Sequence, residues 1–200
     1  LDNINWPLAL KESQRNWIGK SVGALVHFEV DQSDEKIAVF TTRPDTIFGV
    51  SFLTLAPEHP LVARLTTSNQ QQKVKDYIEA TSRRSERERM ADVKTISGVF
   101  TGAYAVHPFT KASIPIWIGD YVLAGYGTGA VMAVPCGDQR DHDFARFFNL
   151  DIPNIFKDVD VEQEAYTQKA DVLLKDSDFL NELNYAKAMP IVIERLETIG

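Results

Sequence analysis

Cysteine, histidine and positive charge are all scarce in this sequence. One cysteine, Cys136, stands among 200 residues, which excludes an internal disulfide and leaves too few thiols for a structural zinc site. A lone thiol suits a reducing compartment, so we expect a cytoplasmic protein. Acidic residues outnumber basic residues by 28 to 21, and the net charge of -7 argues against a broad electrostatic surface for nucleic acid. We expect no metal site, because the histidines lack ligand spacing: His27, His59, His107 and His142.

Long apolar runs are also absent. The longest uncharged stretch, 121–137, has 17 residues and is interrupted by three glycines and a proline, so no membrane span is predicted. The chain begins with Leu1 and shows no basic-then-apolar leader, so we expect no signal peptide and interpret it as part of a longer chain. A composition of 44% hydrophobic and 24% charged residues is typical of a folded domain with a core.

Alternating hydrophobicity predicts a sheet. In residues 24–30, the side chains of Val26, Phe28 and Val30 fall on one face, as a half-buried strand requires. Residues 36–42 alternate as well, so the two runs are expected to form a hairpin. Further strands are predicted at 48–55, 103–106, 114–118, 121–124 and 130–134. Many strands with a few helices indicate the α+β class, with a curved antiparallel β-barrel-like core and peripheral helices.

Four segments have helical features: 58–65, 69–90, 138–148 and the C-terminal residues. In the third, Phe144, Phe147 and Phe148 share one helical face. One side of the last segment is apolar: Ala188, Val192, Leu196 and Ile199. Pro190 is expected to kink this helix or to mark its first turn. The charged run 83–89 alternates in sign, which favours a solvated helix end or loop over an RNA-contacting patch.

Two short elements could carry chemistry. The glycine-rich run 125–131 lacks the Gly-Lys-Ser/Thr ending of a P-loop and the helix that follows a dinucleotide-binding turn. Its glycines favour a tight bend or a close approach of ligand to backbone, as in a pocket wall. Cys136 and His142 could form a nucleophile pair, but no third orienting group accompanies them. We therefore favour a buried thiol at Cys136.

A third candidate is the Asp-Gln-Arg-Asp run at 138–141, where the helix bearing Phe144 begins. Asp138 can cap the helix, and Asp141 is then its third residue, as in a capping-box-like pair. The same placement is expected to keep a carboxylate ionised at the rim of a cavity, ready to accept hydrogen bonds from an ammonium group. The sequence leaves both roles open.

Two motifs together resemble the editing domain of leucyl-tRNA synthetase. They are Thr-Thr-Arg-Pro-Asp-Thr at 41–46 and Gly-Thr-Gly-Ala-Val-Met-Ala-Val-Pro at 127–135, which runs into the 138–141 motif. The flanks, Gln-Arg-Asn-Trp-Ile-Gly at 14–19 and Asp-Ser-Asp-Phe-Leu-Asn at 176–181, are similar as well. The likeness covers nearly the whole chain, with residues 1–20 and 184–200 as the segments that lead into and out of one editing domain. Gly137 departs from the family, which usually has His there.

The resemblance implies hydrolysis of the ester that joins a wrong amino acid, such as norvaline or isoleucine, to tRNA for leucine. It implies two catalytic-site residues, with Asp141 binding the α-ammonium group and Thr46 excluding leucine by steric overlap. Substrate-binding roles are implied for eight further residues: Thr41, Thr42, Arg43, Leu123, Tyr126, Met132, Val134 and Asp138. Among these, Met132 and Val134 are implied to line the pocket for the amino-acid side chain, and Leu123 and Tyr126 are implied to frame the terminal adenine.

The implied partners are the 3′ end of tRNA for leucine with its amino acid and the rest of the synthetase chain, with no membrane and no DNA. No cofactor is expected in this domain, and ATP and Mg²⁺ belong to a catalytic domain outside it. Two alternatives stay open. One is a module that only docks the tRNA end, motivated by Gly137, and the other is a hydrolase that uses Cys136.

Overall fold

The computed structural model describes residues 4–7, 10–11, 23–92, 95–168 and 172–199. Most of the predicted lead-in segment 1–20, including the motif at 14–19, lies outside these residues. The strands are β1 (Ala24–Val30), β2 (Lys36–Thr41), β3 (Phe52–Leu55), β4 (Val99–Val106), β5 (Ser113–Ile118) and β6 (Ala130–Ala133). The helices are η1 (Pro44–Gly49), α2 (Val62–Leu65), α3 (Gln71–Ser82), α4 (Glu86–Ala91), α5 (Gln139–Phe148), η2 (Asp178–Leu180) and α6 (Tyr185–Ile199).

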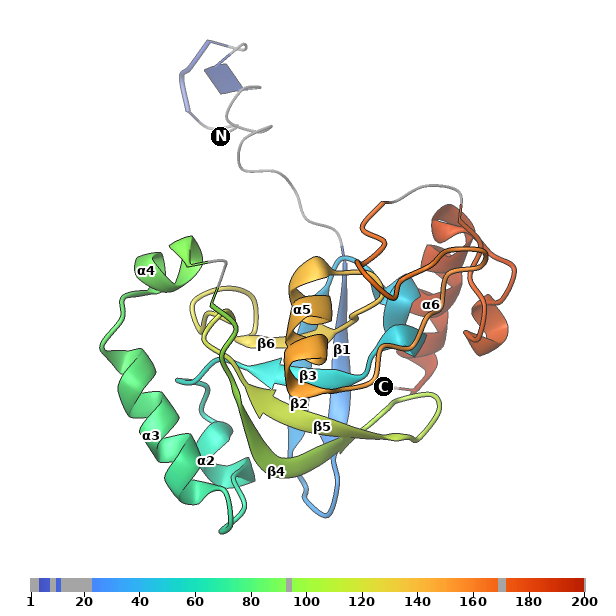
Figure 1. Cartoon of the computed structure of the whole chain (residues 1–200). Coiled ribbons are helices and arrows are strands. Elements are labelled where there is room, and N and C mark those ends of the chain that lie inside the picture. The colour runs from blue at the N-terminus through green and yellow to red at the C-terminus, as the bar shows by residue number, and fades with distance from the viewer. Residues whose placement is uncertain (1–3, 8–9, 12–22, 93–94, 169–171, 200) are drawn as a thin grey trace.

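The six strands form one sheet in the order β2-β1-β4-β5-β3-β6. All pairs are antiparallel except β3 with β5, which is parallel. The two strands at the ends of this order, β2 and β6, lie in contact, so the sheet curls into a nearly closed barrel. We call the line where β2 and β6 meet the seam. The predicted fold class, α+β with a barrel-like core and peripheral helices, is confirmed (Figure 1).

The first hairpin follows the predicted alternation. Val26, Phe28 and Val30 are at most 4% exposed, whereas Leu25 is 53% exposed on the opposite face. Val26 pairs with Val39 across β2, so the same faces of both strands turn inward. Burying such side chains contributes about 1.5–3 kcal/mol each, which fixes the register of the hairpin.

Helices cover the outside of the barrel. In Figure 1, α2, α3 and α4 lie at one side of the sheet and α6 at the other, with α5 in front of β3 and β6. The charged run 83–89 contains a capping box, in which Ser85 accepts from the Glu88 backbone N–H and the Glu88 carboxylate accepts from the Ser85 N–H. Pro190 lies inside α6, whose Ala188 and Val192 are fully buried.

Three local predictions are wrong. Residues 121–124 form turns and no strand, because the apolar Val122 is buried by packing rather than by strand pairing. The strand expected at 48–55 begins only at Phe52, since η1 occupies the residues before it. Phe147 is 64% exposed and does not share the buried face of Phe144. Among the described residues, no helix is both long and apolar enough to cross a membrane.

Candidate functional site

The turn after β2 is held by side chains of its own sequence. Pro44 is the first residue of η1. Proline is tolerated there because the first N–H groups of a helix have no acceptor within the helix. The Arg43 guanidinium donates to both carboxylate oxygens of Asp45, from Nε to Oδ1 and from Nη2 to Oδ2, each at 2.9 Å. The Thr46 hydroxyl donates to the Arg43 carbonyl at 2.8 Å, and Thr46 is 3% exposed. Thr41 accepts from the Arg43 N–H at 3.0 Å, so the turn is rigid.

The second half of the candidate site follows β6. Asp138 is the N-cap of α5 and accepts from the N–H groups of Arg140 and Asp141, which confirms its predicted capping role. The Asp141 carboxylate does not complete a capping box. Its Oδ2 instead accepts from the backbone N–H of Val134 at 2.9 Å, directly after β6. Asp141 therefore ties the start of α5 to the end of β6.

The charge state of Asp141 differs from the sequence-based expectation. Its side chain is almost completely buried, with 8% of the residue exposed, and this burial raises its pKa from 3.8 to about 8. Asp138 raises the pKa further, whereas the Val134 N–H, Tyr121 and Arg140 lower it. The prediction that the helix start keeps this carboxylate ionised is wrong for the free protein, because desolvation outweighs the favourable contacts.

Val134 connects the two halves of the site. Its Cγ1 lies 3.1 Å from the position that a Cβ on Gly49 would occupy, and Gly49 is the last residue of η1. Met132 and Val134 are 7% and 6% exposed on this side of the seam. Cys136, two residues after Val134, also packs against this helix, since its Sγ lies 3.1 Å from the same Cβ position on Gly49. The end of η1 at Gly49 and the residues directly after β6, far apart in sequence, therefore lie together.

The glycine-rich loop leads into β6 at Ala130, the end of that strand opposite to Val134. Gly127 and Gly129 have φ values of 64° and 71°, which other residues rarely adopt. Tyr126 is 81% exposed at the tip of the loop, and Leu123 is half-buried. His59 contacts the loop, because its Cδ2 lies 3.2 Å from the Cβ position of Gly129.

Cys136 is a buried thiol, as the sequence suggested. It is fully buried, and burial raises its pKa to about 11, so the reactive thiolate is scarce near neutral pH. The His142 Nε2 lies 2.9 Å from the Val161 carbonyl, which occupies that ring nitrogen. These observations argue against a Cys/His nucleophile pair. Among the described residues, no group of three or more His, Cys, Asp or Glu side chains could hold a metal ion.

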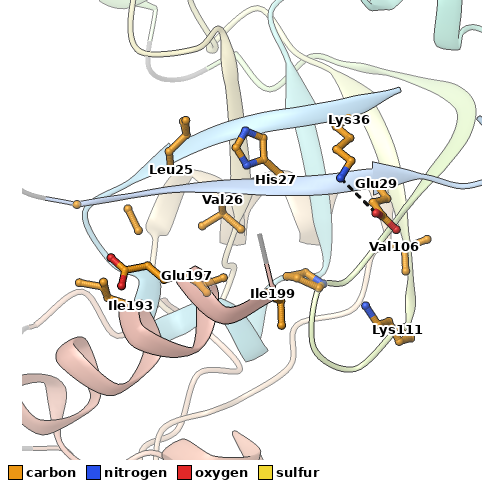
Figure 2. A pocket seen from close by; sticks show the side chains of 14 residues that line it. Leu25, Val26, His27, Glu29, Lys36, Val106, Lys111, Ile193, Glu197 and Ile199 are labelled. Atoms are coloured by element: carbon orange, nitrogen blue, oxygen red, sulfur yellow. Dashed lines mark ion pairs between the residues drawn. The ribbon is translucent and has the colours of Figure 1, made fainter. Parts of the chain in front are cut away.

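One cavity lies away from the two motifs, and another is lined by Gln139 and Arg140 of the second motif. Figure 2 shows the first, of about 460 Å³, between β1 and α6, with Val26, Ile193 and Ile199 on its walls and a Lys36–Glu29 ion pair at 3.4 Å. The second, of about 210 Å³, lies beside the start of α5 and is lined in part by Tyr121. Neither cavity is lined by Asp141 or Thr46.

Sequence reasoning missed three residues of the site. Asp45 is 1% exposed and holds the Arg43 guanidinium. The spacing of two residues between Arg43 and Asp45 could have indicated this ion pair from the sequence. Thr54 is a fully buried hydroxyl in the apolar strand β3, and such a group needs a partner. That partner is Tyr121, whose hydroxyl donates to Thr54 Oγ1 at 2.9 Å and lies 3.4 Å from Asp141 Oδ1. No local pattern could have revealed the Tyr121 contacts.

The fold and the site define an α+β barrel domain with a local polar site at its seam. Residues 15–197 match the family model of the editing domain of leucyl-tRNA synthetase. The chain therefore belongs to the family of leucyl-tRNA synthetase editing domains. Thr42 and Asp138, the remaining predicted binding residues, are both exposed at the two halves of this site.

Known relatives agree with this assignment. The chain is 68% identical over 200 residues to the leucine–tRNA ligase of Christiangramia forsetii, covering 100% of this chain and 21% of the ligase. It is 66% identical over 205 residues to that of Flavobacterium johnsoniae, covering 100% and 22%. The crystal structure of the ternary complex of Agrobacterium radiobacter K84 agnB2 LeuRS-tRNA-LeuAMS contains a chain with 35% identity and a TM-score of 0.72. That match covers 96% of this chain and 21% of the solved chain, so this chain spans about a fifth of its relatives.

Proposed function

We propose that this domain hydrolyses the ester between a non-cognate amino acid, such as isoleucine or norvaline, and the 3′ end of tRNA for leucine. Membership of the editing-domain family supports this, and the buried Asp141 carboxylate, bonded to Val134 directly after β6, is the observation that carries it. One methylene in an apolar pocket contributes only about 1–3 kcal/mol to discrimination, as synthetases for other amino acids illustrate. A second site that removes wrong products therefore serves a ligase acting on leucine.

In this proposal Asp141 anchors the substrate by its α-ammonium group. A charge-assisted hydrogen bond of this kind contributes roughly 1.5–3 kcal/mol. Because a nearby cation favours the charged form of an acid, substrate binding ionises a carboxyl group whose pKa is about 8 in the free protein. The affinity for the ammonium group therefore increases as pH rises towards 8. Asp141 acts as an anchor, and the proposal assigns it no proton abstraction.

Hydrolysis then depends on positioning rather than on a metal or a cofactor of this domain. The ester needs an oriented water and donors for the oxyanion that develops on its carbonyl oxygen. Thr41 and the exposed Thr42 supply hydroxyl groups beside Arg43, whose guanidinium is fixed by Asp45. Tyr126 and Leu123 hold the terminal adenine of the tRNA. ATP and Mg²⁺ serve the catalytic domain of the longer protein.

Thr46 excludes leucine in this scheme. Its hydroxyl is bonded to the Arg43 carbonyl, which fixes the side chain in one rotamer, and Gly49 of the same helix packs against Val134. A rigid wall costs a substrate that overlaps it about 1–3 kcal/mol. Leucine branches at Cγ, whereas isoleucine branches at Cβ and norvaline is unbranched, so a wall placed at the Cγ branch rejects leucine while admitting the other two.

The first test compares Asp141→Ala with the parent in the intact ligase that contains this chain. Hydrolysis of isoleucyl-tRNA is expected to fall roughly 10-fold or more, because the anchoring bond is lost. Asp143→Ala is the matched control, since Asp143 lies on the same helix with half of its side chain exposed. Unchanged hydrolysis in Asp141→Ala would remove Asp141 from the site. If the parent binds mischarged tRNA without hydrolysing it, the domain is instead a module that only docks the tRNA end.

The second test addresses the wall at Thr46. Thr46→Ala is expected to let the intact ligase strip correctly charged leucyl-tRNA, because the steric bar is removed. Thr46→Val is the matched control, since it keeps the branched shape and loses only the bond to the Arg43 carbonyl. The measurement is the rate of leucyl-tRNA hydrolysis. If leucyl-tRNA survives with Thr46→Ala as with the parent, Thr46 is not the excluding residue.

A further inference from the structure

The hydroxyl of Tyr121 lies between two oxygen acceptors. It donates to Thr54 Oγ1 at 2.9 Å and lies 3.4 Å from Asp141 Oδ1. Asp141 Oδ2 is already occupied by the Val134 N–H at 2.9 Å. Tyr121 is therefore the side chain that contacts the remaining oxygen of the anchoring carboxylate. Neither Tyr121 nor Thr54 belongs to the motifs at 41–46 or 127–141.

The tyrosine ring is held in place from several sides. Its centroid lies 5.7 Å from that of Phe144, and the Arg140 guanidinium carbon lies 5.7 Å from the same ring centroid. Gly119 allows this position, since a Cβ there would lie 2.9 Å from Tyr121 Cε1. Thr54 is fully buried on β3. The hydroxyl can therefore change its hydrogen-bond partner by rotation about the C–O bond while the ring stays fixed.

A phenolic hydroxyl has one proton for these two acceptors. When Asp141 is protonated, its own O–H can donate to the phenol oxygen, and the phenol proton then goes to Thr54, in agreement with the shorter distance. When Asp141 is ionised, the carboxylate is the stronger acceptor, because charge-assisted hydrogen bonds are roughly twice as strong as neutral ones. One small rotation thus serves both protonation states of the carboxyl group.

We propose that Tyr121 is a positioning residue for the deacylation site, which holds the ionised Asp141 carboxylate towards the substrate's ammonium group while Thr54 competes for its proton. This inference rests on the proposed function, since it assigns a role to the anchor of that site. Tyr121 acts through Asp141 and makes no contact with the reacting ester. The hydrogen bond from Tyr121 also lowers the pKa of Asp141, in the direction that favours the anchoring form.

Other charged and titratable groups around Asp141 stay in place in the variants. Asp138 and Arg140 face it from the start of α5, with opposite effects on its pKa, and Cys136 lies beside it after β6. The burial of Asp141 is likewise retained when only a hydroxyl is removed from Tyr121. A change in the pH dependence of Tyr121→Phe therefore reports the lost hydrogen bond.

The experiment measures kcat and KM for hydrolysis of isoleucyl-tRNA by the intact ligase between pH 6 and 9, after subtraction of the uncatalysed rate. Three variants are compared with the parent: Tyr121→Phe, Thr54→Val and Tyr104→Phe. Tyr104 is the matched control because it is 41% exposed on β4. The titration of the substrate's own amino group is common to all of them, so differences between variants belong to the protein.

Tyr121→Phe is expected to lower kcat/KM at pH 7 by roughly tenfold, mainly through KM, and to move the acidic limb of the pH profile to higher pH. Thr54→Val is expected to move the same limb to lower pH, because the phenol proton loses its competing acceptor. Tyr104→Phe is expected to match the parent. A general loss of packing would not move the acidic limb in opposite directions in Tyr121→Phe and Thr54→Val.

A Tyr121→Phe profile that overlays the parent would overturn the inference while leaving the proposed function intact. Shifts of both variants in the same direction would also overturn it. If Tyr121→Phe is not recovered in folded form, the direction of the Thr54→Val shift decides. A parent that does not hydrolyse isoleucyl-tRNA at any pH would instead overturn the proposed function, and this inference with it.

Discussion

Burial of Asp141 predicts that its replacement by asparagine stabilises the protein at alkaline pH. The pKa of this carboxyl group is about 8 in the folded chain against 3.8 for an ordinary aspartate. Between these values the folded state binds a proton that the unfolded chain has released, so the free energy of unfolding falls as pH rises from about 4 to about 8. At 1.36 kcal/mol per pKa unit, the total loss is about 6 kcal/mol.

Asp141→Asn removes this titration and keeps the local hydrogen bonds. The asparagine oxygen can accept from the Val134 N–H, and its amide can donate to the Tyr121 hydroxyl. The variant is expected to be several kcal/mol more stable than the parent at pH 9 and close to it at pH 4. Urea unfolding of the 200-residue chain at both pH values, followed by circular dichroism, measures the difference.

The opposite result would refute the reasoning about desolvation. If Asp141→Asn is less stable than the parent at pH 9, then the ionised carboxylate is well solvated or well paired in the fold, and its pKa is low. Asp143→Asn, at the exposed position two residues further along α5, controls for the general effect of removing one negative charge. A gain in stability together with a loss of hydrolysis would indicate that the site retains a costly group for function.

Two further predictions concern stability away from the site. Gly102 has a φ of 86°, and a Cβ there would lie 2.0 Å from the Thr67 hydroxyl, so Gly102→Ala is expected to lower the free energy of unfolding by about 1–3 kcal/mol in urea. Equal stability would show that β4 adapts. The Tyr77 hydroxyl accepts from the Asp120 N–H at 2.9 Å and bonds Ser97 at 2.8 Å, so Tyr77→Phe is expected to cost about 1–3 kcal/mol in the same assay. The exposed Tyr104→Phe should cost nothing, and equal losses would contradict this account.

Local patterns in the sequence were sufficient for much of the fold. The β1–β2 hairpin followed from the alternation of Val26 and Phe28, because a strand with one buried face must repeat every two residues. The N-cap at Asp138 followed from the residue type and from the helical period after it. The family's motifs likewise located both halves of the candidate site.

The remaining features depend on contacts between distant segments. Residues 121–124 have the apolar character of a strand, but they form a turn in which Val122 is buried by packing, and composition alone cannot distinguish the two. The pairing of Tyr121 with Thr54 joins positions 67 residues apart. The protonation of Asp141 follows from how deeply the folded chain buries it, and no property of the helix start predicts that depth.

The two halves of the site come together only when the barrel closes at the seam. η1 follows β2, and the Val134–Asp141 contact follows β6, which are the two end strands of the hydrogen-bonded order. Each half can form while the other is still apart, but a substrate can be gripped and screened only after both ends of the sheet have come together. If the domain hydrolyses mischarged tRNA as proposed, this activity should appear only late in folding, and a local opening along the seam should abolish it while most strand pairs persist.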